Sequence, residues 1–361
     1  MRKLLIIPMV IALFIFGCED IYDPGIESVE PLLVVEARII YGNIYNEVRL
    51  YKTIRFNDPA NHFPPASEAL VTLTDDRNSV IILPEGLDGR YRLMQNLDPR
   101  RRYRLKIVYD GETYESEYEF IPELPSIDSV YVVPATKLIE TGNDESARNL
   151  RKALGSQLYI DIKGTGSESH FRFTGRKIVQ YNYTAADPVL RPPMEGTMFA
   201  WTTLYPSDMF NIAGPPEYSV SNDIIKFPLE FMERSYTPFI PDTPTIFMGW
   251  IYICQQYALS ENAFNFYQDL NSQLSAGGKL VDPLYTQARG NIRCTSDPDK
   301  IILGNFEIST VREHRFYVQW LRNDDYYVKR IPYFWNIPPE GKVFNIPPVW
   351  WEYIGKVYPW Q

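Results

Sequence analysis

The chain has 361 residues, of which 45% are hydrophobic and 14% aromatic, so it is long enough for two or three domains and apolar enough to bury their cores. Its formal net charge of −9 argues against nucleic-acid binding, which needs a basic surface. Tyrosine is frequent, with 26 residues, and suits sandwich cores, interfaces and sugar-stacking surfaces alike.

The first segment, residues 1–17, has the pattern of a lipoprotein signal peptide. Arg2 and Lys3 give it a positive start, and residues 4–16 form an apolar run that is too short to span a bilayer. The Ile-Phe-Gly-Cys sequence at residues 15–18 looks like a bacterial lipobox, although its phenylalanine is bulkier than the usual occupant. We therefore expect cleavage before Cys18 and attachment of lipid to it; an ordinary signal peptide with a chance cysteine is the alternative.

Residues 18–31 are acidic, contain proline and glycine, and indicate a tether between the lipid and the first domain. Beyond the signal no long uncharged apolar segment follows, so we expect attachment to the membrane by the lipid alone.

Short alternating apolar and polar segments fill residues 32–122 and are separated by polar turns. Asp110-Gly111 lies between two of these segments and is a strong hairpin signal. Many short strands with frequent turns are typical of an immunoglobulin-like β-sandwich, which we predict here. The strand-like segments are residues 32–39, 47–51, 70–74, 79–83, 89–93, 103–109 and 113–120.

A proline-containing boundary at residues 122–125 precedes a larger β-rich domain, residues 126–361, in which we expect one or two short helices. The firmer helix lies near residues 260–276, where Ser260 is a suitable N-cap and apolar residues recur at spacings of three and four. A weaker helical pattern covers residues 144–154. The long β-like run at 301–321 predicts a hairpin.

The C-terminal segment from residue 326 is dense in aromatic residues and prolines. Its large rings suit either the core of the second domain or a surface that binds a ligand or a protein partner. The candidate partner or ligand residues are Trp335, Trp350, Trp351 and Trp360.

Two cysteines, Cys254 and Cys294, remain after Cys18 is assigned to the lipid. A pair of cysteines in an exported protein fits a disulfide, and buried free thiols fit the same count; both alternatives stay open. No histidine lies at ligand spacing from either cysteine, so we expect no metal site.

No catalytic residues can be assigned from motifs. The chain has no Gly-x-Ser-x-Gly elbow, phosphate loop, dinucleotide fingerprint or zinc motif, so we expect no cofactor. A pair of carboxylates for glycoside hydrolysis stays open, because space rather than sequence sets such a pair.

Several short motifs, in order and spacing, resemble domain-of-unknown-function family 4249 of the Bacteroidota. The motifs are the lipobox, Leu33-Val34-Val35-Glu36-Ala37, residues 69–75, Gly89-Arg90-Tyr91, Tyr103-Arg104-Leu105, Gly290-Asn291-Ile292 and residues 302–309. The likeness covers nearly the whole mature chain, with Ala37 where relatives often carry glycine.

The resemblance implies an outer-membrane lipoprotein, often encoded beside a TonB-dependent transporter. In these bacteria, acidic residues after the lipidated cysteine are similar to a surface-export signal, and Glu19 and Asp20 fit it. We therefore expect a non-enzymatic, cell-surface lipoprotein that captures an unknown ligand for a TonB-dependent barrel or assists it. The alternatives are a surface glycoside or peptide hydrolase and a structural or adhesive envelope protein.

Overall fold

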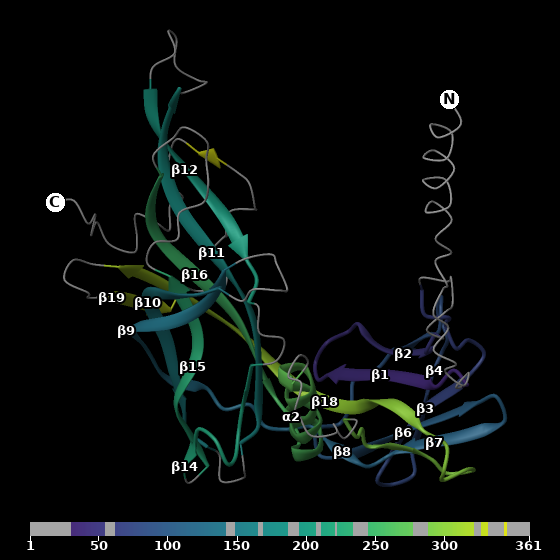
Figure 1. Ribbon diagram of the computed structural model, residues 1–361. Helices are drawn as coiled ribbons and strands as arrows, with labels where there is room; N and C mark the ends of the chain where they lie inside the picture. Colours follow the sequence, from purple (N-terminus) through teal and green to yellow (C-terminus); the bar gives the residue numbers. More distant parts are fainter. Residues whose placement is uncertain are drawn as a thin grey trace, which may run out of the picture.

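The computed structural model describes residues 30–54, 62–141, 149–164, 169–186, 195–206, 211–220, 222–233, 245–276, 288–320, 326–330 and 343–344. These residues form mainly β-structure with a single α-helix, α2 (Glu261–Ala276), so the predicted fold class is confirmed. Figure 1 shows two β-rich bodies that meet beside α2.

The largest sheet, called here the shared sheet, contains ten strands in the described part of the chain and runs through both bodies. Its main path is β20 (Val343–Phe344), β12 (Glu195–Leu204), β11 (Phe171–Ala186), β16 (Thr245–Ala258), β18 (Ile302–Trp320), β1 (Leu33–Ile40), β2 (Asn46–Lys52) and β5 (Arg90–Leu93). Two short strands lie off this path, β13 (Asn211–Ala213) beside β11 and β19 (Tyr326–Arg330) beside β18.

Two smaller sheets each pack face to face against one half of the shared sheet. The first contains β17 (Ile292–Cys294), β7 (Glu112–Ser116), β6 (Arg102–Tyr109), β3 (Leu70–Asp75) and β4 (Val80–Leu83), with β8 (Glu119–Phe120) beside β6. The second contains β14 (Ser219–Val220), β15 (Asp223–Glu233), β10 (Asn149–Ile162) and β9 (Ile127–Thr141).

Strand β18 belongs to both bodies. Its first half pairs in parallel with β1, with Ala37 opposite Phe306, and its second half pairs antiparallel with β16. Phe306 and Ile308 lie in the first hydrophobic core, whereas Phe316 and Val318 lie in the second. Because alternate residues of a strand point to the same face, both cores lie on one face of the shared sheet.

This topology changes two sequence-based expectations. β17 and the first half of β18 belong to the sheets of the first sandwich, so residues 32–122 alone do not complete it. The hairpin predicted at 301–321 is wrong, because β18 is one continuous strand from Ile302 to Trp320. The sequence pattern is β-like throughout that run, but its two halves pair with different partners rather than with each other.

Local signals predicted other elements with mixed success. The helix near 260–276 is confirmed: the backbone N–H of Ala263 donates to Oγ of Ser260 at 3.2 Å, as expected of an N-cap. The weak helical pattern at 144–154 is wrong over its described part, since Asn149 begins β10 and pairs with Thr141 of β9. Cross-strand pairing outweighs weak helix propensity there.

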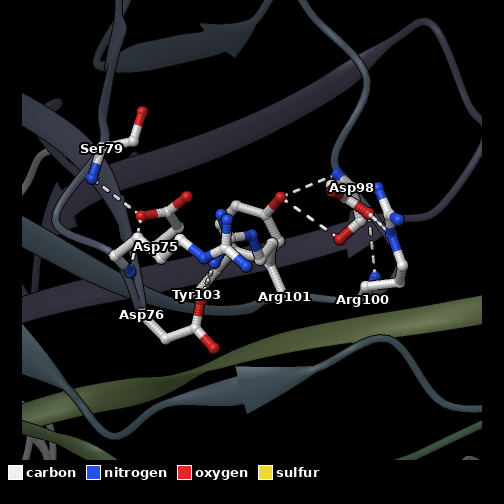
Figure 2. Close-up of polar contacts among 8 residues, drawn as sticks. Asp75, Asp76, Ser79, Asp98, Arg100, Arg101 and Tyr103 are labelled. Atoms are coloured by element: carbon white, nitrogen blue, oxygen red, sulfur yellow. Dashed lines mark hydrogen bonds and ion pairs between the residues drawn. The ribbon is translucent and has the colours of Figure 1, made fainter.

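A tyrosine corner fixes one end of the first sandwich. Figure 2 shows Oη of Tyr103 accepting the backbone N–H of Asp98 at 2.7 Å and donating to the Asp98 carbonyl at 3.3 Å. A tyrosine bonded to backbone a few residues upstream is a hallmark of immunoglobulin-like folds. The neighbouring arginines form ion pairs with carboxylates. Arg100 donates to Asp98 and lowers the pKa of that carboxyl, and Nη1 of Arg101 lies 3.1 Å from Oδ1 of Asp76.

The junction of the two bodies, called here the waist, is held on both faces of the shared sheet. On the core face, the segment linking β8 to β9 is fixed by side chains of the sheet: Oγ1 of Thr310 donates to the Pro122 carbonyl at 2.7 Å, and Nε2 of Gln256 donates to the Pro125 carbonyl at 3.3 Å. On the opposite face, α2 packs through Ala263, Phe264 and Tyr267 against Tyr257.

Candidate functional site

A groove of about 460 Å³ opens on the face of the shared sheet that carries α2, and we call it the waist groove. It lies within the range of about 300–1,000 Å³ that is typical of small-molecule sites. Its lining is mostly charged, and it draws on β1, β2, β11, β16 and β18. The lining residues are Glu36, Arg38, Ile40, Tyr45, Glu47, Arg49, Arg172, Tyr257 and Glu307.

The floor of the waist groove holds a buried ion pair. Nη2 of Arg172 lies 3.7 Å from Oε1 of Glu307, and the two side chains are only 8% and 2% exposed. The guanidinium lies against two tyrosine rings, 4.3 Å from the centroid of Tyr257 and 4.7 Å from that of Tyr267. Such cation–π contacts strengthen when the cation is removed from water, so the rings hold the guanidinium in place.

This ion pair is not fully hydrogen-bonded. Nε of Arg172 and Oε1 of Glu307 are buried, and neither makes a hydrogen bond within the described ranges. Burial raises the pKa of the Glu307 carboxyl, and the Arg172 charge opposes that rise only in part. Buried polar atoms are normally satisfied, so the groove floor retains capacity to bind a polar group.

Strand alternation explains how these charges reach one place. Arg172 lies between Phe171 and Phe173 on β11, whose rings fill the second core, so its own side chain emerges on the opposite face. The register then aligns Arg172 with Tyr257 across β11 and β16. It aligns Arg38 with Glu307 across β1 and β18.

The rim of the waist groove is also ordered by hydrogen bonds. Oη of Tyr51 donates to Glu36 at 2.9 Å, and burial together with this carboxylate raises the pKa of Tyr51 to about 12. Tyr51 is therefore a neutral hydrogen-bond donor at physiological pH.

An amide and carboxyl network supports the helix beside the groove. Nδ2 of Asn291 donates to Glu119 at 2.9 Å and to the Phe306 carbonyl at 2.8 Å, and Nδ2 of Asn262 on α2 donates to Glu119 at 3.3 Å. Burial raises the pKa of the Glu119 carboxyl. Gly290 precedes Asn291 and faces the backbone of Gly304 so closely that a Cβ atom would clash with it. The Gly290-Asn291-Ile292 motif therefore joins β17, β18 and α2.

The opposite face of the waist carries a neutral network. Nε2 of His314 lies 2.9 Å from Oε1 of Gln256, which is fully buried, and the amide of Gln256 continues to the Pro125 carbonyl. Burial, followed by Arg330 and Arg312, lowers the pKa of His314 to about 4. His314 is thus a neutral hydrogen-bonding group at physiological pH.

A second cleft, of about 450 Å³, lies in the second sandwich beside Phe173, Tyr252 and Phe231. Its lining carboxylate, Glu230, already accepts Nζ of Lys177 at 2.9 Å, and the Lys137 ammonium lies 5.3 Å from the centroid of the Phe231 ring. The waist groove, with its unsatisfied buried atoms, is therefore the better candidate site.

The two predicted disulfide cysteines are both free, so that alternative is corrected. Cys254 lies in the second hydrophobic core and Cys294 in the first. Burial raises the pKa of the Cys254 thiol, and Sγ of Cys294 lies 3.3 Å from Oγ of Ser296. The number of cysteines in the sequence could not show that the two lie in different cores, because the pairing of strands distant in the chain determines which core each cysteine enters.

Other predicted site residues lie outside the described residues. This applies to the lipidation site Cys18, to Glu19 and Asp20, and to the four tryptophans Trp335, Trp350, Trp351 and Trp360. Within the described ranges, no three His, Cys, Asp or Glu side chains gather so as to hold a metal ion. In those ranges, no helix has the length and apolar character needed to cross a membrane.

Sequence reasoning missed the ion pair of the groove floor. One usable signal was present: Arg172 stands between two phenylalanines in a strand, a position that places a charge on the second face of a sheet. Glu307 lies in the same way between Phe306 and Ile308. No local pattern shows that these two charges meet.

No curated protein and no solved structure matches the chain. A family model described as "Domain of unknown function (DUF4249)" matches residues 19–315, which include the first sandwich, α2, most of β18 and the second sandwich apart from β19 and β20. The chain therefore belongs to this family of unknown function.

Proposed function

We propose that this protein is a non-enzymatic lipoprotein of the outer membrane, exposed at the cell surface through the lipid on Cys18, which captures a ligand for a TonB-dependent transporter. The waist groove is the proposed ligand site. The single observation that carries the ligand-capture part is the buried pair Arg172–Glu307, which lines a groove of small-molecule size and includes two atoms without hydrogen bonds in the described structure.

The groove is built for binding with little rearrangement. Its charged side chains stand on strands of one sheet, and the Arg172 guanidinium is held against two tyrosine rings. A site whose groups are already fixed loses less entropy when a ligand binds. The Glu119 carboxyl accepts the amides of Asn262 on α2 and of Asn291, and so supports the helix beside the groove.

One observation favours a second candidate, a surface hydrolase. The groove contains the Glu307 carboxyl, whose pKa is raised by burial, together with Glu36 and Glu47. Carboxyl groups in different environments can act as acid and base. Turnover of glycoside or peptide substrates that is abolished by Glu307→Gln would favour this reading over capture.

Lipid anchoring is tested by fractionation of cells that produce Cys18→Ala. We expect the wild type in the outer-membrane fraction and the variant in the soluble fraction, because the lipid is the proposed attachment. Cys254→Ala is the matched control and should stay with the membrane. A Cys18→Ala protein that remains membrane-bound without lipid would contradict the anchor.

Partnership with a transporter is tested by purifying the full chain from membranes in mild detergent, followed by mass spectrometry. We expect a TonB-dependent barrel to co-purify in near-equal amount. A parallel preparation of an unrelated outer-membrane lipoprotein controls for general carry-over. The absence of any barrel protein would remove the transporter part of the proposal and leave ligand capture to be judged separately.

A further inference from the structure

We infer that the ligand of the waist groove is a small polycarboxylate, bound by the arginines that surround it. This inference rests on the proposed function and names the ligand's chemical class. It comes from the charge distribution on one face of the shared sheet.

Four arginines stand on adjacent strands of that face, and we call them the arginine face: Arg38 on β1, Arg49 on β2, and Arg90 and Arg92 on β5. Their side chains are 57%, 49%, 46% and 57% exposed. The register places Arg49 directly opposite Arg90. Like charges at paired positions destabilise a sheet, so this arrangement has a cost that fold alone does not require.

The carboxylates of the face do not balance these arginines. Glu47 alone lies near three of them, 3.9 Å from Arg49, 3.7 Å from Arg90 and 3.1 Å from Arg92. Glu36 lies 4.0 Å from Arg38 and also accepts the Tyr51 hydroxyl. Among the residues that the structure describes, four guanidinium groups on this face thus lie near two carboxylates, in a chain whose net charge is −9. A local excess of one charge focuses the field on ligands of the opposite sign.

The floor of the groove also offers a guanidinium that can bind a carboxylate. The Arg172–Glu307 pair adds no net charge, but Nε of Arg172 makes no hydrogen bond in the described structure. Two tyrosine rings lie against the guanidinium, and the N–H donors of a guanidinium point outward from its edge. The planar fork of a guanidinium matches the two oxygens of a carboxylate.

The spacing favours a ligand with more than one carboxylate. Neighbouring strands lie about 4.8 Å apart, and three such spacings separate Arg172 on β11 from Arg38 on β1, so a single carboxylate does not span both the floor and the rim of the groove. All the cations that line the groove are arginines rather than lysines. Bidentate recognition of planar anions is the property that distinguishes arginine from lysine.

The test is calorimetric titration of the detergent-solubilised full chain with propane-1,2,3-tricarboxylate, and with its uncharged trimethyl ester as the matched probe. We expect the tricarboxylate to bind with an affinity that falls as salt rises, and the ester not to bind. Each loss of a charge-assisted hydrogen bond, in Arg38→Gln or Arg49→Gln, should weaken binding by about tenfold or more. Arg172→Lys keeps the charge but loses the fork and should weaken binding similarly.

The control variant is Arg293→Gln, because Arg293 is 80% exposed on β17 of the other sheet. Thermal unfolding of every variant separates lost binding from lost folding, and the two rim variants should unfold as the wild type does. Equal binding of the ester, or equal losses in Arg293→Gln, would overturn the inference. Inorganic phosphate is the competing anion: tighter binding of phosphate, with the same dependence on Arg38 and Arg49, would overturn the carboxylate assignment.

Two results separate this inference from the proposed function. If the tricarboxylate fails to bind while a barrel protein still co-purifies, only the ligand class falls. If the tricarboxylate binds through these arginines and no barrel co-purifies, the transporter partnership falls and the ligand class stands.

Discussion

The two faces of the waist hold the same junction by different means. On the core face, neutral groups form a continuous chain from His314 through Gln256 to the Pro125 carbonyl. On the α2 face, the charged pair of Arg172 and Glu307 is buried at 3.7 Å with two atoms that lack hydrogen bonds. One network is complete and closed, whereas the other is incomplete and opens into a groove.

This difference indicates that the neutral network has a structural role at the waist and that the ion pair has a functional one. A hydrogen-bonded neutral network stabilises a junction modestly and needs nothing further. A buried ion pair costs desolvation, and replacing it with apolar side chains often stabilises a protein. We interpret the charged pair beside the groove as a sign of binding, and the neutral network as a structural support of the junction.

The largest effect is expected from removing one partner of the ion pair. Arg172→Ala leaves the Glu307 carboxyl buried without its cation, which should lower the free energy of unfolding by about 3–5 kcal/mol. Chemical denaturation measures it. The double variant Arg172→Met with Glu307→Met is the control and should recover most of the loss. A cost below about 1 kcal/mol for Arg172→Ala would show that the pair is effectively solvated.

An intermediate effect is expected from acid on the neutral face. His314 has its pKa lowered from 6.5 to about 4, so between these values the unfolded state binds a proton that the folded state does not. The free energy of unfolding should therefore fall as pH drops from 6.5 to 4, by up to about 3 kcal/mol in total. Below pH 4 the titration of His314 should lower it no further.

The His314 contribution is isolated by comparing slopes. His314→Gln should flatten the dependence of unfolding free energy on pH between 6.5 and 4, whatever its effect at neutral pH. Thermal unfolding across that range provides the measurement, with His62→Gln as the control because His62 is exposed. Parallel slopes in wild type and His314→Gln would mean that His314 titrates normally in the folded chain.

The smallest effect concerns the arginine face. Arg90→Gln relieves the like-charge pair with Arg49 and should raise the free energy of unfolding by a few tenths of a kcal/mol. Arg92→Gln is the neighbouring control: it loses a hydrogen bond to Glu47 of 3.1 Å and should lower stability slightly. Denaturant midpoints compare the two. A clear stability loss in Arg90→Gln would assign this arginine a structural role instead.

Local sequence patterns predicted many of the strands and the helix. Alternating residues such as those of β1 and β6 predict strands, because one face of each must be buried. Ser260 and the spacing after it predict α2, since an N-cap and an apolar stripe are local properties. The family resemblance, resting on short ordered motifs, agrees with the match over residues 19–315.

Only the tertiary structure decided how these elements combine. The parallel pairing of β1 with β18 joins residues that are far apart in the chain and makes one sheet serve two cores. It also decides that Cys254 and Cys294 lie in different cores and that Arg38 stands beside Glu307. Residue types and spacing determine which side chains alternate on a strand, but the register between distant strands depends on packing of the whole chain. The candidate site therefore could not be read from the sequence alone.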